Sequence, residues 1–243
     1  MIIETFTNKE DMGAAAAGAG IAKLKEVLAD KGSASIIVAT GVSQFDILAI
    51  LTKSDLPWNK ITAFHLDEYV GLPITHGASF RKYLWERFVT QLPLPPAAFH
   101  FLDGEGDAEA ECERVSELIS ACAIDVAFVG VGENGHLAFN DPPADFETEK
   151  PYLVVDLDDA CRRQQLGEGW FPDFESVPSR AISMSIRQIM KSDTIICTVP
   201  DERKAEAVKN ATQGPITPEV PASILQDHPN CRMFLDTASA SLR

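Results

Sequence analysis

The sequence has a shortage of positive charge and contains no long apolar segment. Of its 243 residues, 21 are basic and 36 acidic, which gives a formal net charge of −15. Nucleic-acid-binding surfaces need clustered lysine and arginine; no such cluster occurs, so we expect no nucleic-acid partner. No apolar run is long enough to cross a bilayer, and acidic residues rather than a basic segment precede residues 14–22. We therefore expect no membrane association and a cytoplasmic location.

Cysteines are also sparse, and their spacing indicates no cross-link or metal site. Their number is five, which is odd, and no two form Cys-x-x-Cys. This pattern argues against a disulfide framework or a structural zinc site and is typical of a reducing compartment. We expect Cys197, in the apolar run 194–199, to lie in the core. The sequence also lacks the HExxH spacing of zinc enzymes and the GxxxxGKS/T spacing of a P-loop, so we predict no metal and no ATP site.

Short apolar runs alternate with longer amphipathic stretches along the chain, and 45% of the residues are hydrophobic, as in folded globular proteins. This alternation predicts βαβ units, right-handed crossovers and a mainly parallel sheet in an α/β fold. The predicted strands are residues 35–39, 61–66, 99–102, 124–129, 153–155, 181–184, 195–199 and 231–235. The predicted helices are residues 12–29, 45–51, 79–88, 108–121 and 204–210.

The most informative stretch is residues 130–143, GVGENGHLAFNDPP, which directly follows the predicted strand 124–129. Its glycines allow a tight turn and a close approach of the backbone to a ligand. His136 is suited to acid–base chemistry near neutral pH, and Asp141 is close enough in sequence to orient the imidazole. Because open α/β sheets bind ligands at the carboxyl ends of their strands, we predict a ligand site here.

Three other interpretations of this stretch remain open to different degrees. It could be a structural βα turn whose histidine forms a cap. Gly130, Gly132 and Gly135 nearly match a dinucleotide fingerprint, but residues 139–143 interrupt the helix which that motif must open, so NAD binding is not expected. The histidines and aspartates of the candidate site could hold a metal, but their spacing in the sequence matches no metal-binding motif.

Three further places carry candidate polar groups. Asp67 and Glu68 follow the predicted strand 61–66 and are either proton-transfer groups or turn residues, whereas His65 is expected to be packed. Residues 40–43 (TGVS) follow another strand and open a helix, which favours phosphate binding, with an N-cap at Ser43 as the alternative. Lys204 is either a counter-charge for a phosphate or an ordinary surface lysine.

Residues 66–72 (LDEYVGL) together with residues 130–142 resemble the glucosamine-6-phosphate deaminase family, also called glucosamine-6-phosphate isomerases. The similarity extends over most of the chain, and the two motifs are specific as a pair. The resemblance implies a Rossmann-like, three-layer α/β/α fold and one sugar-phosphate isomerase/deaminase domain over residues 1–243. It also implies conversion of glucosamine 6-phosphate and water to fructose 6-phosphate and ammonia, with a sugar phosphate as the small-molecule partner and no cofactor. Homo-oligomerisation is left open.

The resemblance assigns roles by position. Asp67 matches the aspartate that moves a proton between C2 and C1 of the sugar, and His136 matches the histidine that opens the ring. Asp141 matches the carboxylate partner of that histidine, and Asn134 a polar neighbour of it. The phosphate-binding groups of the family match Thr40, Gly41, Ser43 and Lys204.

Several positions depart from the family pattern. Val42 stands in a loop that is usually richer in glycine, and Asp141 is one methylene shorter than the usual glutamate. The arginine that many members use for phosphate is not evident near Gly169, and Arg162 and Arg163 are the candidates to replace it. Two alternatives to the deaminase function remain, and these departures keep the second of them open. One is another sugar-phosphate enzyme of the same fold, such as a 6-phosphogluconolactonase or a deaminase for an isomeric amino sugar. The other is a non-catalytic sugar-phosphate-binding regulator.

Overall fold

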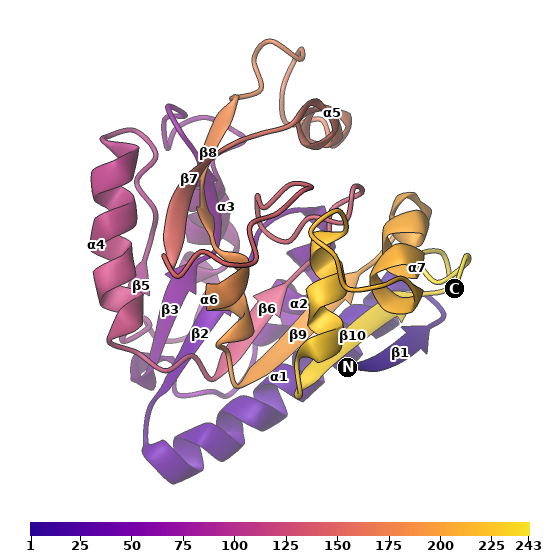
Figure 1. Cartoon of the computed structure of the whole chain (residues 1–243). Coiled ribbons are helices and arrows are strands. Elements are labelled where there is room, and N and C mark those ends of the chain that lie inside the picture. The colour runs from indigo at the N-terminus through magenta and orange to yellow at the C-terminus, as the bar shows by residue number, and fades with distance from the viewer.

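Seven parallel strands form the central sheet of the computed structural model, which describes residues 1–243 (Figure 1). Their order across the sheet is β1-β10-β9-β6-β2-β3-β5, and every neighbouring pair is parallel. The predicted mainly parallel sheet is thus confirmed. The strands are β1 (Ile2–Phe6), β2 (Ala34–Val38), β3 (Ile61–His65), β5 (Ala98–His100), β6 (Val126–Val129), β9 (Thr194–Val199) and β10 (Cys231–Asp236).

Helices cover both faces of this sheet and give the expected three layers. On one face, α1, α2 and α3 bury their apolar sides in a cluster with residues such as Ile36 and Phe128. On the other face, α4, α6 and α7 pack in a larger cluster with residues such as Ile37 and Cys197. The helices are α1 (Lys9–Lys31), α2 (Phe45–Leu51), α3 (Phe80–Arg87), α4 (Ala108–Ser120), α5 (Asp159–Gly167), α6 (Ile186–Met190) and α7 (Ala205–Gln213).

A separate three-stranded antiparallel sheet extends beyond the central sheet, toward α5 (Figure 1). It consists of β4 (Asp67–Tyr69), β8 (Arg180–Met184) and β7 (Tyr152–Asp156), in that order. The runs 153–155 and 181–184 are therefore strands as predicted, and they lie outside the parallel central sheet. They pair with each other and with β4, and their Tyr152 and Met184 side chains share the larger core cluster with the central sheet.

The strand order places a crevice between β2 and β6. After β2 the chain continues to β3 and β5 on one side, whereas β6, β9 and β10 lie on the other side. Ligands bind at such a switch point, outside the carboxyl ends of the strands. The core expectations for Cys197 and His65 are confirmed, since neither is exposed to solvent. None of the helices combines the length and the apolar character that crossing a membrane would require.

Candidate active site

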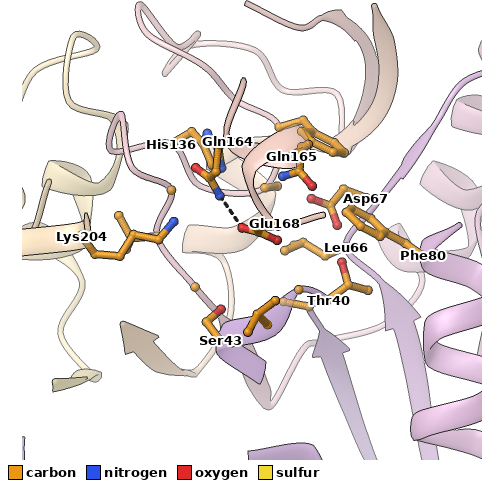
Figure 2. A pocket seen from close by; sticks show the side chains of 18 of the residues that line it. Thr40, Ser43, Leu66, Asp67, Phe80, His136, Gln164, Gln165, Glu168 and Lys204 are labelled. Carbon is orange, nitrogen blue, oxygen red and sulfur yellow. Dashed lines mark hydrogen bonds between the residues drawn. The ribbon is translucent and has the colours of Figure 1, made fainter. Parts of the chain in front are cut away.

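Four loops, one from the carboxyl end of each of four strands of the central sheet, meet in an open cavity, whose empty space, part of it solvent at the mouth, is about 730 Å³ (Figure 2). They follow β2, β3, β6 and β9 and contribute residues 39–43, 66–67, 130–132, 200–201 and 203–204. Six of the residues predicted from the sequence line it, namely Thr40, Gly41, Ser43, Asp67, His136 and Lys204. The structure thus brings the separate sequence motifs to one place.

Asn134 and Asp141, the two remaining predicted residues, bond to His136 without lining the cavity. Nδ1 of His136 lies 3.0 Å from Oδ1 of Asp141. The Asn134 side chain donates to the same carboxylate oxygen at 3.0 Å and accepts from the backbone N–H of His136 at 3.1 Å. The shorter Asp141 therefore still reaches the histidine, and Asn134 holds both partners.

This arrangement fixes the tautomer of His136. An ionised carboxylate only accepts hydrogen bonds, so Nδ1 carries the proton and Nε2 keeps its lone pair. Burial opposes the charge of Asp141, but the bonds from His136, from Asn134 and from the backbone N–H of Asp158 outweigh it and lower its pKa. The pair is therefore built to stabilise a positive charge on the imidazole.

Two glycines of the motif have defined steric roles beside this histidine. A Cβ on Gly132 would lie 2.3 Å from Nε2 of His136, so only glycine leaves room for the ring. Gly135 has φ +86°, a conformation that L side chains rarely adopt. The glycines thus place the imidazole against the backbone at the end of β6.

Asp67 is the first residue of β4, two residues after the end of β3, and it lines the cavity. Its carboxyl group is buried, and Oδ1 has no hydrogen-bond partner. Burial, with a smaller contribution from the charge of Glu68, raises the pKa of Asp67 to about 8. A carboxyl group with a pKa near neutrality is suited to taking and returning a proton.

Glu68, its neighbour, has a different environment. Its carboxylate is fully buried and accepts four hydrogen bonds from the start of α3 and from its own strand. The donors are the backbone N–H groups of Tyr69, Phe80 and Arg81 and the hydroxyl of Ser79. Glu68 thus joins β4 to α3, which is the turn role that the sequence left open for both acids.

The loop at residues 40–43 is held by contacts that its sequence did not indicate. Gly41 has φ +94°, and its carbonyl accepts from the Tyr83 hydroxyl at 2.9 Å. The buried Gln44 side chain donates to Thr198 Oγ1 on β9 at 2.9 Å. Helix α2 begins only after a short 3₁₀ turn, Val42–Gln44, and Ser43 makes no capping bond, so the N-cap alternative is wrong.

Lys204 lies against the cavity with only 7% of its surface exposed, so it is not an ordinary surface lysine. It ends the 3₁₀ turn Glu202–Lys204, which begins after Asp201, a non-glycine residue with φ +87°. Burial lowers the pKa of Lys204, while the nearby carboxylates of Glu168 and Glu133 act in the opposite direction. A desolvated ammonium of this kind attracts a phosphate more strongly than an exposed one.

Several residues of the cavity wall were missed by the sequence analysis. Gln164 and Gln165 on α5, Glu168 after it and Arg203 all line the cavity. Figure 2 shows the Gln164 side chain donating to Glu168, at 3.0 Å. The one feature of the sequence that could have predicted α5 is Asp158, a residue type common at helix N-caps. Its side chain caps the helix by accepting from the Cys161 N–H.

Neither of the arginines considered as a replacement for the family's phosphate-binding arginine lines the cavity. Arg162 donates to the carbonyls of Phe174 and Val177, and Arg163 is exposed. Arg203 is the arginine that reaches the wall. The segment at residues 167–178 packs by burying Phe171, whose ring centroid lies 5.5 Å from that of Tyr69.

Comparisons with known proteins agree with the motifs. The family model described as glucosamine-6-phosphate isomerases/6-phosphogluconolactonase matches residues 7–233. A glucosamine-6-phosphate deaminase of Bacillus cereus (strain B4264) is 35% identical over 227 residues, which cover 93% of this chain and 84% of the relative. One of Bacillus thuringiensis (strain Al Hakam) has the same identity and coverage.

Solved structures extend the comparison to the fold. A monomeric glucosamine-6-phosphate deaminase superposes with a TM-score of 0.91 at 31% identity, over the full length of both chains. A 6-phosphogluconolactonase from Thermotoga maritima has a TM-score of 0.80 at 17% identity, over 97% of this chain and 99% of the other, and at that identity it shows the fold alone. The resemblance found in the two sequence motifs is confirmed, and the chain belongs to the family of glucosamine-6-phosphate isomerases and 6-phosphogluconolactonases.

Proposed function

We propose that this protein is an enzyme that converts glucosamine 6-phosphate and water to fructose 6-phosphate and ammonia, with residues 1–243 acting as one domain. The observation that carries the proposal is the pair of proton-transfer groups in one cavity. Asp67, with its raised pKa, and His136, oriented by Asp141, both reach a cavity that also holds the buried Lys204. Figure 2 shows Asp67 and Lys204 on opposite sides of this cavity.

The phosphate group is the first part of the substrate to be assigned. Lys204, Arg203 and the loop at residues 40–43 supply cationic, hydroxyl and backbone groups to the cavity wall. A phosphate held there contributes binding energy far from the reacting carbons, which positions C1 and C2 near Asp67 and His136. The phosphate site therefore explains how C1 and C2 of a small open-chain sugar stay next to the proton-transfer groups while protons move.

Ring opening is the step assigned to His136. The imidazole takes the proton of the C1 hydroxyl through Nε2 and returns a proton to the ring oxygen as the C1–O5 bond breaks, which leaves an aldehyde at C1. Asp141 stabilises the imidazolium formed in between, because its carboxylate bonds to Nδ1. The step needs one group that both accepts and donates a proton, and imidazole does so near neutral pH.

The isomerisation and deamination steps are assigned to Asp67. Its carboxylate takes the C2 proton while the aldehyde oxygen at C1 accepts a proton from the C2 ammonium of the substrate, which gives a neutral enolamine. The protonated Asp67 then delivers its proton to C1, which leaves an iminium at C2. Water adds to C2 and ammonia leaves, so that C2 becomes the ketone of fructose 6-phosphate. The sequence of steps moves protons and one water molecule, and the raised pKa of Asp67 suits a base that must become an acid within one turnover.

A substrate comparison tests this function. Purified protein is incubated with glucosamine 6-phosphate, and ammonia and fructose 6-phosphate are measured separately; equal amounts of the two are expected. Asp67→Asn is the matched control, because it removes the base while keeping the size of the side chain. Hydrolysis of 6-phosphogluconolactone in place of ammonia release would replace the proposal with a lactonase, and tight sugar-phosphate binding without any turnover would replace it with a binding protein.

A further inference from the structure

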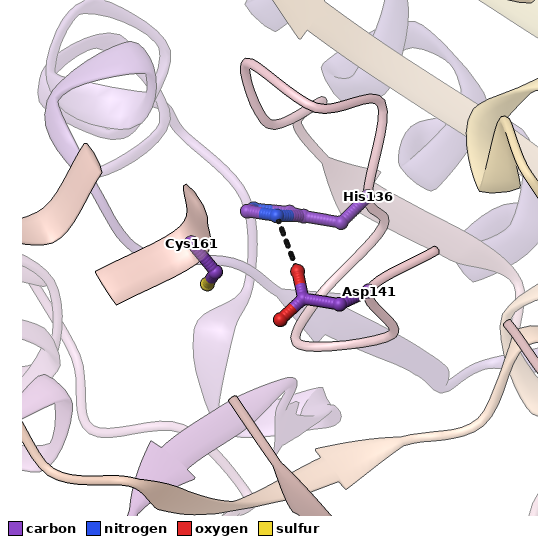
Figure 3. A group of neighbouring side chains, drawn as sticks. All are labelled: His136, Asp141 and Cys161. Carbon is purple, nitrogen blue, oxygen red and sulfur yellow. Dashed lines mark hydrogen bonds and ion pairs between the residues drawn. The ribbon is translucent and has the colours of Figure 1, made fainter. Parts of the chain in front are cut away.

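His136, which lines the cavity, lies close to Asp141 and Cys161, and the three side chains are of types that can ligate a metal ion (Figure 3). His136, Asp141 and Cys161 each offer one ligand atom, and these atoms all lie within 4.8 Å of one another. His136 and Cys161 are buried, and the Asp141 side chain is nearly so. The first two residues come from the loop after β6 and the third from the first turn of α5, so tertiary packing brings them together.

We propose that His136 Nδ1, Asp141 and Cys161 Sγ bind Zn²⁺, or another divalent ion that accepts thiolate, and that this binding switches the catalytic histidine off. A nitrogen, an oxygen and a sulfur ligand form the mixed donor set that Zn²⁺ accepts, whereas Mg²⁺ and Ca²⁺ prefer oxygen alone. Three protein ligands leave the fourth tetrahedral position for water, as in other zinc sites with an open position.

The geometry needs only small movements to accept the ion. Zinc bonds of roughly 2.0–2.3 Å in a tetrahedron place neighbouring ligand atoms about 3.4–3.6 Å apart. The His136–Asp141 contact of 3.0 Å must open by a few tenths of an ångström, and a separation of 4.8 Å to the sulfur would close by about 1 Å. Rotation of side chains in the first turn of α5 and in the loop supplies shifts of this size.

The proton and charge balance favours a buried complex. The Cys161 thiol loses one proton to solvent, and the proton on Nδ1 of His136 is replaced by one on Nε2, so the imidazole stays neutral. The two charges of Zn²⁺ are then matched by the thiolate and by the Asp141 carboxylate. A site with no net charge avoids the cost of burying an unpaired ion.

Inhibition of ring opening by the metal rests on the proposed function of His136, and it follows from the tautomer of that histidine. Without metal, Asp141 holds the proton on Nδ1 and Nε2 accepts. With metal on Nδ1, Nε2 carries the proton and cannot take one from the sugar. The ion therefore inhibits ring opening without occupying the phosphate side of the cavity.

Metal binding is tested first, by a measurement that requires no turnover. Cd²⁺ alone is titrated into the wild-type protein while the thiolate-to-metal charge-transfer absorption in the ultraviolet is recorded, and Zn²⁺ is then added as a competitor. We expect a saturable band that Zn²⁺ removes. Cys161→Ser and Cys161→Ala should lower the affinity by roughly 100-fold or more, because a direct ligand is lost. Cys122→Ser, which changes a partly exposed cysteine outside the group, should leave the band unchanged.

Inhibition is tested second, with glucosamine 6-phosphate as substrate. Zn²⁺ should inhibit the wild type and Cys122→Ser, a chelator should restore both, and Cys161→Ser should keep its basal rate while resisting Zn²⁺. Thermal melting confirms that each variant is folded. If Cys161→Ser does not fold, Cys161→Ala is used in its place. The absence of a band in the wild type, or equal Cd²⁺ binding by both Cys161 variants, would overturn the site whether or not the deaminase activity is found. Equal inhibition of Cys161→Ser would overturn the switch.

Discussion

Asp67→Asn should abolish turnover and stabilise the protein at the same time, because the wild-type carboxyl group is buried with an unpartnered oxygen. Burial raises its pKa from 3.8 to about 8. Between these two values the unfolded chain has released the proton while the folded protein retains it, so the free energy of unfolding falls as pH rises. Asparagine has no charge to lose and escapes this penalty.

The size of this stability penalty follows from the size of the pKa shift of Asp67. Each pH unit between the two pKa values contributes about 1.4 kcal/mol, so the penalty reaches about 4 kcal/mol at pH 7 and is about 3 kcal/mol smaller at pH 5. The cost of burying the asparagine amide does not depend on pH and cancels from the difference. For a chain of this length, 3 kcal/mol corresponds to roughly 6–12 °C in Tm.

The assay compares the melting of wild type and Asp67→Asn at both pH values, with turnover measured alongside. The stability advantage of the variant should grow by about 3 kcal/mol from pH 5 to pH 7, and its kcat should fall by about 10²–10⁴-fold. In the wild type, kcat/KM should rise about tenfold per pH unit and level off above about pH 8, because only the ionised Asp67 can take the C2 proton. A pH-independent stability difference, or a flat pH profile of kcat/KM below pH 8, would refute the reasoning.

Three further substitutions test other parts of the site. Asp141→Asn replaces the acceptor-only carboxylate at Nδ1 of His136 with an uncharged amide that can also donate, so the tautomer is no longer fixed and kcat should fall by about 10²–10⁴-fold. Asp141→Glu should retain most of the rate; near-normal kcat in the asparagine variant would contradict the tautomer argument. Lys204→Ala should raise KM for glucosamine 6-phosphate by roughly 10–100-fold with a smaller effect on kcat, since the phosphate is bound equally before and during reaction; a loss confined to kcat would contradict that role. Gly132→Ala places a methyl group 2.3 Å from the His136 ring and should lower kcat at least about tenfold while the protein remains folded, as checked by steady-state kinetics and melting.

The sequence predicted those parts of the fold and site that depend on local pattern. Apolar runs between amphipathic stretches marked the interior strands, and the loop after β6 gathers its glycines, histidine and aspartate within a dozen residues. The edge strand β1 and the exact limits of α1 were missed, although Asn8 caps that helix by accepting from the Asp11 N–H. The roles of individual site residues remain predictions until the substitutions are measured.

The parts that the sequence did not predict depend on contacts between distant segments. Helix α5 is short and polar, so nothing in its own composition distinguished a cavity wall from an exposed helix; Gln164 and Gln165 become buried only because the helix packs over the loop that follows β6. The same holds for β7 and β8, whose apolar runs are compatible with either sheet until β4 provides an antiparallel partner. Asp67 and Glu68 are adjacent acids whose different surroundings arise from the packing of α3.

The division of the protein into two sheets has a mechanical consequence. Asp67 belongs to the small antiparallel sheet, whereas the loops that carry Thr40 and Lys204 extend from the central one. The two sheets are linked near the site by backbone bonds of Leu66, which donates to Val38 and accepts from Met184. With the site roles proposed above, a sugar phosphate bound at both ends would act as a tether between two independently paired layers. Amide exchange in β4 and β8 should slow when that tether is in place, so the substrate restrains the sheet that carries the base.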